Sequence, residues 1–278
     1  MQLKDIAICV ASAQEDAGAL DLAQALAAKT GAHVACSAIG IMPAPILYNE
    51  FGMGAAYVEQ LNQDKELIDR FWADLQKTLD KKDLRCELRR HRTYGTNLES
   101  LVATIARHAD LTIIRAPAKD ILQPHAQMIE AALLGSGRPV MVAPVEWKSG
   151  PVGKRMVVGW DASREAARAV HDALLVAEEG AEITVVTVDA KAGSLDHGDA
   201  PGLDIAAHLA RHGHKVTLRN EGSLGRSAHE VILQVAMDKN ADMIVLGGYR
   251  HARLQQALFG GMTRSMLRDV KLPLLLSH

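Results

Sequence analysis

The sequence has few aromatic residues, few cysteines and almost no net charge. Phe, Trp and Tyr make up 4% of its 278 residues, and the formal charge is −2 at pH 7. Surfaces that bind nucleic acid or anionic lipid need a basic field, and single-strand binders add aromatic stacking platforms. The composition therefore argues against nucleic acid and membranes as partners.

Only three cysteines are present, Cys9, Cys36 and Cys86, and no two of them have the C-x-x-C spacing. They lie in or beside apolar stretches, which favours buried, reduced thiols. No apolar run approaches the roughly 18 residues of a membrane span, and the first residues lack the apolar core of a signal peptide. The sequence predicts a cytoplasmic protein without disulfides.

Signature motifs of several enzyme classes are also absent. The chain has no G-x-S-x-G, no H-E-x-x-H and no G-x-x-x-x-G-K-[ST], and no G-x-G-x-x-G follows its first strand. Asp161 and Thr263 could together hold a metal ion and a water for slow ATP hydrolysis. We nevertheless expect a protein that is not an enzyme.

The chain does contain an internal duplication. The segment HADLTIIRAP recurs as NADMIVLGGY, RPVMVAP recurs as LPLLLSH, and KDIAICVAS recurs as KRMVVGWDAS. Three segments that recur in the second half of the chain indicate two copies of one structural unit. The polar stretch VEWKSGPVGKR, which carries Gly and Pro, separates the copies. We predict one domain over 1–148 and a second over 152–278.

Apolar strands alternate with amphipathic helices in each half. Strands such as EITVVTV are continuously apolar, which is typical of parallel strands buried on both faces. The alternation predicts an α/β fold with two doubly wound, five-stranded parallel sheets. We expect strands at 5–10, 33–39, 85–91, 111–115, 139–143, 155–160, 182–188, 214–219, 242–247 and 273–277. We expect helices at 14–29, 55–81, 97–108, 124–135, 163–179, 202–212, 226–239 and 254–269.

The loops after the strands of the second half form the candidate site, because doubly wound folds bind ligands where the strand order reverses. Asp161 follows the first strand of this half, and Gly247 and Gly248 follow the fourth. Bare amides near a helix start accept anions well. A carboxylate for a ribose and an amide-lined turn for phosphates together indicate a nucleotide. The remaining candidates, near the start of the last helix, are Gly260, Gly261, Met262 and Thr263.

Two structural explanations remain open for these residues. Asp161 could cap the helix that begins near Ser163, because Asp is a favoured capping residue. The glycines could serve close packing of a helix on the sheet. Glycine inside a helix lowers stability by about 1 kcal/mol relative to alanine. The presence of these glycines therefore needs a reason, either a ligand or close packing.

With these residues the chain resembles the universal stress protein family in its tandem two-domain form. The family's phosphate motif is G-x2-G-x9-G-[ST], and Gly247 and Gly260 match its first and third glycines. Arg250 stands at the second glycine and Gly261 at the Ser/Thr position. The resemblance implies an adenine nucleotide α-hydrolase-like fold, in which the last strands of the two halves pair across a pseudo-two-fold axis.

The resemblance also implies that Asp161 contacts the sugar of the nucleotide and that the main chain of Val188 faces adenine. The implied ligand is ATP or another adenine nucleotide, with Mg²⁺. The implied role is a stress response that acts through an unknown protein partner, with a homodimer as a further option. The alternative is a nucleotide-free interaction protein whose cleft is closed by Arg250.

The first half departs further from the family motif. Its loop after the fourth strand has no glycine next to the strand, and Ser12 stands near the place of Asp161. We expect Glu15 and Asp16 to lie on the following helix. The sequence predicts no nucleotide in this half.

Overall fold

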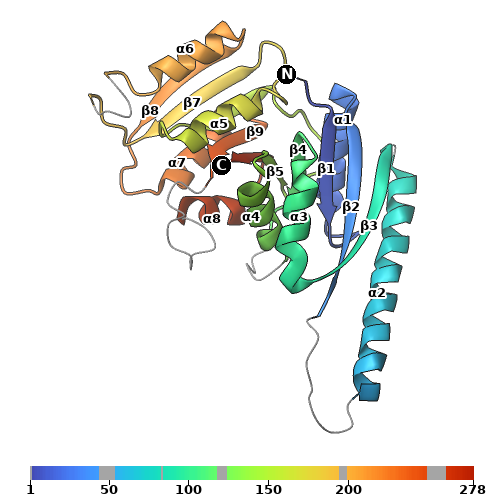
Figure 1. The fold of residues 1–278 in the computed structure, drawn as a ribbon. Helices are drawn as coiled ribbons and strands as arrows, with labels where there is room; N and C mark the ends of the chain where they lie inside the picture. The colour runs from blue at the N-terminus through green and yellow to red at the C-terminus, as the bar shows by residue number, and fades with distance from the viewer. Residues whose placement is uncertain (1, 44–53, 83, 118–123, 194–198, 249–260) are drawn as a thin grey trace.

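The computed structural model describes residues 2–43, 54–82, 84–117, 124–193, 199–248 and 261–278 (Figure 1). The strands within these residues are β1 (Asp5–Val10), β2 (His33–Met42), β3 (Cys86–Tyr94), β4 (Leu111–Arg115), β5 (Val140–Ala143), β6 (Arg155–Gly159), β7 (Glu182–Val188), β8 (Lys215–Glu221), β9 (Met243–Gly247) and β10 (Leu274–Ser277). The α-helices are α1 (Ala17–Thr30), α2 (Gly54–Lys81), α3 (Leu98–Arg107), α4 (Pro124–Ser136), α5 (Arg164–Ala173), α6 (Leu203–Arg211), α7 (Ala228–Asp238) and α8 (Gly261–Arg268), and a short 3₁₀ turn, Gly95–Asn97, precedes α3.

The described strands form one sheet in the order β3-β2-β1-β4-β5-β10-β9-β6-β7-β8. Read outward from the centre, each half has its fifth, fourth, first, second and third strand in turn. Neighbouring strands are parallel within each half, and β5 and β10 pair antiparallel at the centre with Leu275 opposite Met141. This confirms the predicted α/β class and the pairing of last strands across a pseudo-two-fold. The two predicted sheets are thereby joined into one ten-stranded sheet, with β3 and β8 at its outer ends (Figure 1).

Two apolar layers cover the sheet, and each layer is shared by both halves. Side chains of α1, α2, α5 and α6 form one buried cluster with alternate strand residues, including Leu275. Side chains of α3, α4, α7 and α8 form the other, including Leu274 and Leu276. Successive side chains of a strand point to opposite faces, so the short strand β10 contributes to both layers. The core is therefore continuous across the centre of the sheet.

The repeated Ala-Asp pair tethers the first strand of each half to the fourth. The carboxylate of Asp110, just before β4, accepts hydrogen bonds from the main-chain N–H groups of residues 4 and 5, at 2.9 and 3.1 Å. The Asp242 side chain, just before β9, is nearly fully buried. Its carboxylate likewise accepts hydrogen bonds from main-chain N–H groups at the start of β6. Its donors are the N–H groups of Gly153, Lys154 and Arg155, at 2.7, 3.1 and 2.8 Å.

The helix predicted over 163–179 ends at Ala173, where the chain passes into tighter turns bonded three residues back. A contact between the halves accompanies this change. The Lys29 ammonium donates to the carbonyl oxygens of Val152 and Val176, at 2.8 and 2.9 Å. Burial lowers the pKa of Lys29, although the nearby Glu178 carboxylate acts in the opposite direction. Lys29 therefore ties α1 of the first half to the turns that follow α5.

Other predicted boundaries differ where strands pair beyond their apolar stretch. Strands β2 and β3 pair residue by residue as far as Met42 and Tyr94, although the apolar pattern indicated ends at 39 and 91. The helix predicted over 254–269 is described only as α8, and its first predicted residues lie outside the described part of the chain. The division between 148 and 152 stays a prediction. No helix among the described residues has the length and apolar character needed to cross a bilayer.

The Asp242 tether yields a stability prediction. We expect Asp242→Ala to lower the free energy of unfolding by about 1–3 kcal/mol, because it leaves buried N–H donors without partners. Asp110→Ala, which releases two N–H groups in a more exposed position, should cost less. Urea unfolding followed by circular dichroism measures both. An equal or larger loss in Asp110→Ala would contradict this account of the repeat.

Candidate functional site

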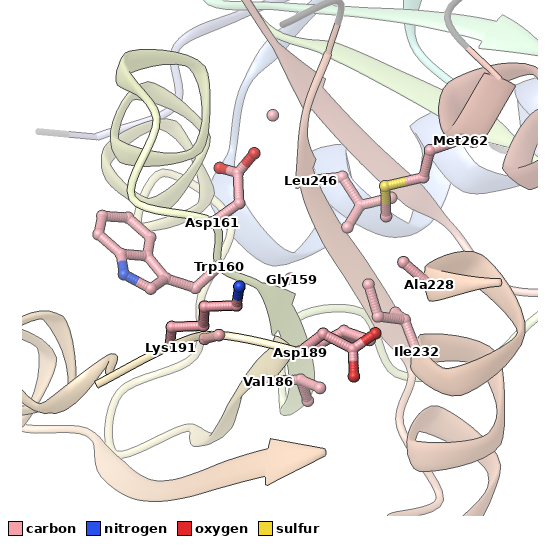
Figure 2. Close-up of a pocket in the computed structure, with 13 residues that line it drawn as sticks. Gly159, Trp160, Asp161, Val186, Asp189, Lys191, Ala228, Ile232, Leu246 and Met262 are labelled. Carbon is pink, nitrogen blue, oxygen red and sulfur yellow. The ribbon is translucent and has the colours of Figure 1, made fainter. Parts of the chain in front are cut away.

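A pocket of about 330 Å³ lies at the carboxyl ends of β6, β7 and β9 (Figure 2). Strand β6 lies between β7 and β9, so this is where the strand order of the second half reverses. Ligand pockets commonly fall at this point in doubly wound folds, with volumes of roughly 300–1,000 Å³. The described lining comprises Gly159, Trp160, Asp161, Val186, Val188, Asp189, Ala190, Lys191, Ala228, Ile232, Leu246, Gly247 and Met262.

The pocket has a polar and an apolar side. Asp161 and Lys191 extend from the loops after β6 and β7 on one side (Figure 2). Leu246, Ile232 and Met262 stand on the other side, from β9, α7 and α8. A few polar groups set into a largely apolar lining are typical of small-molecule sites, because the polar groups orient the ligand.

Asp161 holds the residue that caps helix α5. Ser163 is the N-cap, and its hydroxyl accepts a hydrogen bond from the N–H of Ala166 at 3.1 Å. The same hydroxyl donates to Asp161 Oδ1 at 2.5 Å, and the Ser163 N–H donates to this oxygen at 3.1 Å. The residue that caps α5 is therefore Ser163 and not Asp161. Asp161 holds the Ser163 side chain in place and itself lines the pocket.

Other atoms lie close to Gly247 and Gly248. A Cβ on Gly247 would lie 2.4 Å from the nitrogen of Ala166 and 2.6 Å from the carbonyl carbon of Glu165, at the start of α5. A Cβ on Gly248 would lie 2.8 Å from Leu133 Cδ2, on a helix of the other half. Among the described residues, a Cβ on Gly261 would meet no atom within 4 Å. Close packing against main chain therefore accounts for Gly247, which also lines the pocket, whereas the contact at Gly248 is with the end of a leucine side chain that can shift.

The structure brings together four of the predicted site residues: Asp161, Val188, Gly247 and Met262 line the pocket. The other described candidates are not among its lining residues. Gly248 turns toward β10, where its N–H donates to the carbonyl of Ser277 at 2.8 Å. Gly261 is exposed, and Thr263 is buried within α8. The predicted residues Arg250 and Gly260 lie outside the described residues.

Sequence reasoning missed Trp160, Asp189 and Lys191. Asp189 has a left-handed backbone with φ of 51°, and its Oδ1 accepts a hydrogen bond from the N–H of Ser223 at 2.9 Å. Hydrogen bonds from the side chain and main chain of Ser223 lower the pKa of this carboxyl. The signal for these residues was their place after β7, because carboxyl ends of neighbouring parallel strands share one edge.

The first half is filled at the corresponding place by a buried ionic cluster. Arg115 ends β4 as Gly247 ends β9, and its side chain is 1% exposed. Its Nε donates to Asp16 Oδ1 at 3.1 Å, and its Nη2 donates to Glu15 Oε2 at 2.8 Å. The expectation that Glu15 and Asp16 lie on the helix is wrong, because α1 begins at Ala17. Asp16 instead precedes the helix and points its carboxylate inward.

His125 completes this cluster in a defined tautomer. Its Nδ1 lies 3.0 Å from Arg115 Nη2, and its Nε2 lies 2.7 Å from Asp16 Oδ1. A guanidinium can only donate, so Nδ1 accepts and Nε2 carries the proton toward Asp16. Burial acts to raise the pKa of Asp16, but bonds from His125 and the amides of Ser12 and Ala11 outweigh it, so the pKa lies below its usual value. That this half binds no nucleotide stays a prediction.

Comparisons with known proteins agree with this architecture. Residues 153–278 match the model of the universal stress protein family. Over its full length the chain has the fold of the tandem form of that family, as the solved structures show. A comparison with curated proteins finds no match.

Three solved structures illustrate the likeness. A universal stress protein from Archaeoglobus fulgidus is 16% identical, with a TM-score of 0.66 over 99% of this chain and 96% of its own. A putative universal stress protein from Pseudomonas aeruginosa is 16% identical, with a TM-score of 0.54 over 99% and 93%. A shorter universal stress protein, solved in complex with cAMP, is 21% identical, with a TM-score of 0.35 over 45% and 97%.

The glycine contacts predict different effects on stability for two matched Gly→Ala substitutions. Gly247→Ala should destabilise the protein by about 1–3 kcal/mol, because the added methyl group meets the main chain at the start of α5. Gly261→Ala places its methyl group at the start of α8, where it meets no atom of the described residues within 4 Å, so we expect no loss of stability. Thermal unfolding compares the two. Equal losses in both variants would contradict the packing explanation.

The ionic cluster predicts a large cost for removing its cation. We expect Arg115→Met to lower the free energy of unfolding by about 3–5 kcal/mol, because Asp16 would stay buried without its charged partner. The control is Arg70→Met, which removes a solvent-exposed pair with Glu66 and should cost less than about 1 kcal/mol. Chemical denaturation measures both, and a loss below 1 kcal/mol for Arg115→Met would contradict this role.

Proposed function

We propose that the second half binds an adenine nucleotide in the pocket beside Asp161 and reports its presence to a protein partner in a stress response. The observation that carries the proposal is a pocket of nucleoside size at the strand-order reversal, lined by the carboxylates of Asp161 and Asp189 and by apolar side chains. The match of residues 153–278 to the universal stress protein family supports the same conclusion.

The lining suggests how the parts of a nucleotide would be placed. The apolar side chains of Val186, Ile232 and Leu246 suit the flat adenine ring, and the main chain at Val188 offers groups for its edge. The Asp161 carboxylate suits the ribose hydroxyls. Phosphates would extend past Gly247 toward the start of α8, because the N–H groups of a helix's first turn favour anions, and Mg²⁺ would accompany the phosphates.

The role proposed is binding rather than designed catalysis. Asp161 already accepts two hydrogen bonds from Ser163, and these orient it as part of a turn. An oriented carboxylate is well suited to accept bonds from sugar hydroxyls, because its own geometry needs no rearrangement on binding.

A second candidate is a nucleotide-free interaction protein. The observation in its favour is that packing against the main chain at the start of α5 explains why position 247 is glycine without any ligand. In this alternative the Arg250 side chain closes the cleft and the domain acts through its surface.

A thermal-shift titration with MgATP separates the two functions. A ligand present at 100 times its dissociation constant stabilises the folded state by about 2.7 kcal/mol. We expect wild-type protein to gain melting temperature at millimolar MgATP and Asp161→Ala to lose that gain. The control is Asp238→Ala, which removes an exposed carboxylate of α7 outside the pocket lining and should respond like wild type.

The remaining outcomes are also informative. No shift in the wild-type protein would favour the nucleotide-free function. A full shift in Asp161→Ala would mean that nucleotide binds elsewhere on the chain. Mass spectrometry of small molecules released from the purified protein would identify a ligand that is retained through purification.

A further inference from the structure

Strand β3 forms one outer end of the ten-stranded sheet and lies in the first half, apart from the strands that carry the pocket. It pairs with β2 along its whole length, from Cys86 to Tyr94, and no other strand of the described residues pairs with it. An edge strand presents unpaired N–H and C=O groups to which a further extended segment can bond. Addition of a strand at such an edge is one of the common modes of peptide recognition.

Basic side chains are concentrated on this edge. The strand and the residue before it carry four arginines and one acidic residue, in a chain whose formal charge is −2. The arginines are Arg85, Arg89, Arg90 and Arg92, the acidic residue is Glu87, and all five are exposed. Burial lowers the pKa of His91, and the nearby Arg89 lowers it further, so this ring adds little charge at neutral pH.

The fold neutralises only part of this charge. Arg89 donates to both carboxylate oxygens of Glu87, at 2.9 and 2.8 Å. In the part of the chain that the structure describes, the side chains of Arg85 and Arg90 form no ion pair or hydrogen bond. The edge therefore keeps positive charge that is available to a partner.

The arginines flank the edge on both faces of the sheet. Arg92 lies over the Trp72 ring of α2, 4.9 Å from its centroid, and donates to Asp69 of the same helix at 2.8 Å. Successive side chains of a strand point to opposite faces, so Arg90 shares the α2 face with Arg92, and Arg89 lies on the other face. The side chains of an added strand alternate in the same way. Acidic side chains on either face of that strand would therefore lie beside an arginine.

The other outer end of the sheet, β8, provides an internal comparison. It occupies the corresponding place in the second half, but its basic residues are only Lys215 and Arg219. Arg219 already pairs with Glu221, at 2.6 Å. The duplication thus presents two edges that match in position and differ in charge.

We propose that the β3 edge binds an extended acidic segment of a partner protein as an additional strand of the sheet. Main-chain hydrogen bonds would supply affinity, and the arginines would select acidic side chains and speed the encounter. A second copy of the same edge is disfavoured, because its arginines would face arginines. The surface includes no residue that lines the pocket, so this inference goes beyond the proposed nucleotide function and does not depend on it.

The test is fluorescence anisotropy with a labelled peptide of nine residues, the length of β3, in which Glu and Val alternate. We expect saturable binding that weakens as salt is raised, and no binding of the same peptide with Lys in place of Glu. Arg90→Glu should weaken binding by about tenfold or more, because it places like charges side by side. The matched control is Lys215→Glu, which reverses one exposed cation on the β8 edge and should bind like wild type.

Two further measurements separate strand addition from attraction between charges alone. The peptide should slow hydrogen exchange of the amides of residues 86–94 and leave those of residues 215–221 unchanged. A peptide N-methylated at every residue keeps its charge but has no N–H donor, so we expect it to bind at least about tenfold more weakly.

Four results would overturn the proposal. They are the absence of saturable binding, equal losses in Arg90→Glu and Lys215→Glu, unchanged affinity for the N-methylated peptide, and tighter binding of a single-stranded oligonucleotide of the same length. The last result would identify the edge as a surface for nucleic acid instead of a protein segment.

Discussion

The antiparallel pairing of β5 with β10 is the contact on which the rest of the structure depends. Each of these strands is short, apolar and last in its half, so alone it would be an exposed edge open to aggregation. Their pairing, with Leu275 opposite Met141, removes both edges and buries these residues completely. The strands left at the outer ends, β3 and β8, carry many charged side chains, which protect the edges that remain.

The same pairing sets the geometry of the loops after the fourth strand of each half. The Gly248 N–H donates to the carbonyl of Ser277, and the Ala116 N–H donates to the carbonyl of Ala143, both at 2.8 Å. Each last strand thus holds the first residue of the loop that would face a ligand. Because both halves share this framework, one difference between them lies in the side chain at the end of the fourth strand, Arg115 or Gly247.

Much of the fold followed from the sequence because the strands are continuously apolar. The limits of β1, β4 and β7 were predicted to the residue. Boundaries were missed where distant contacts decide them, as where Lys29 of the first half binds the Val176 carbonyl. Of the site, Asp161 was found because it follows a strand, and Lys191 was missed although the same rule applies to it.

The glycines show a further limit of sequence reasoning. A glycine in the sequence shows that a Cβ is absent at that position. It does not show whether a ligand or a neighbouring helix occupies the space. At Gly247 the short distances to the main chain of α5 favour the packing explanation, whereas among the described residues nothing packs close to Gly261. The motif spacing is the same whether a glycine serves helix packing or ligand binding. Only the three-dimensional contacts distinguish the two.

Electrostatics constrains how the proposed ligand would lie in the pocket. Asp161 and Asp189 both line it, and the hydrogen bonds from Ser223 favour the ionised form of Asp189. Two carboxylates repel phosphate oxygens, so a nucleotide would turn its neutral hydroxyls toward them. Its phosphates would then meet the amides at the start of α8, where the helix dipole is positive, while Lys191 partly offsets the negative side. The arrangement of charge therefore favours one orientation of the ligand before any motif is considered.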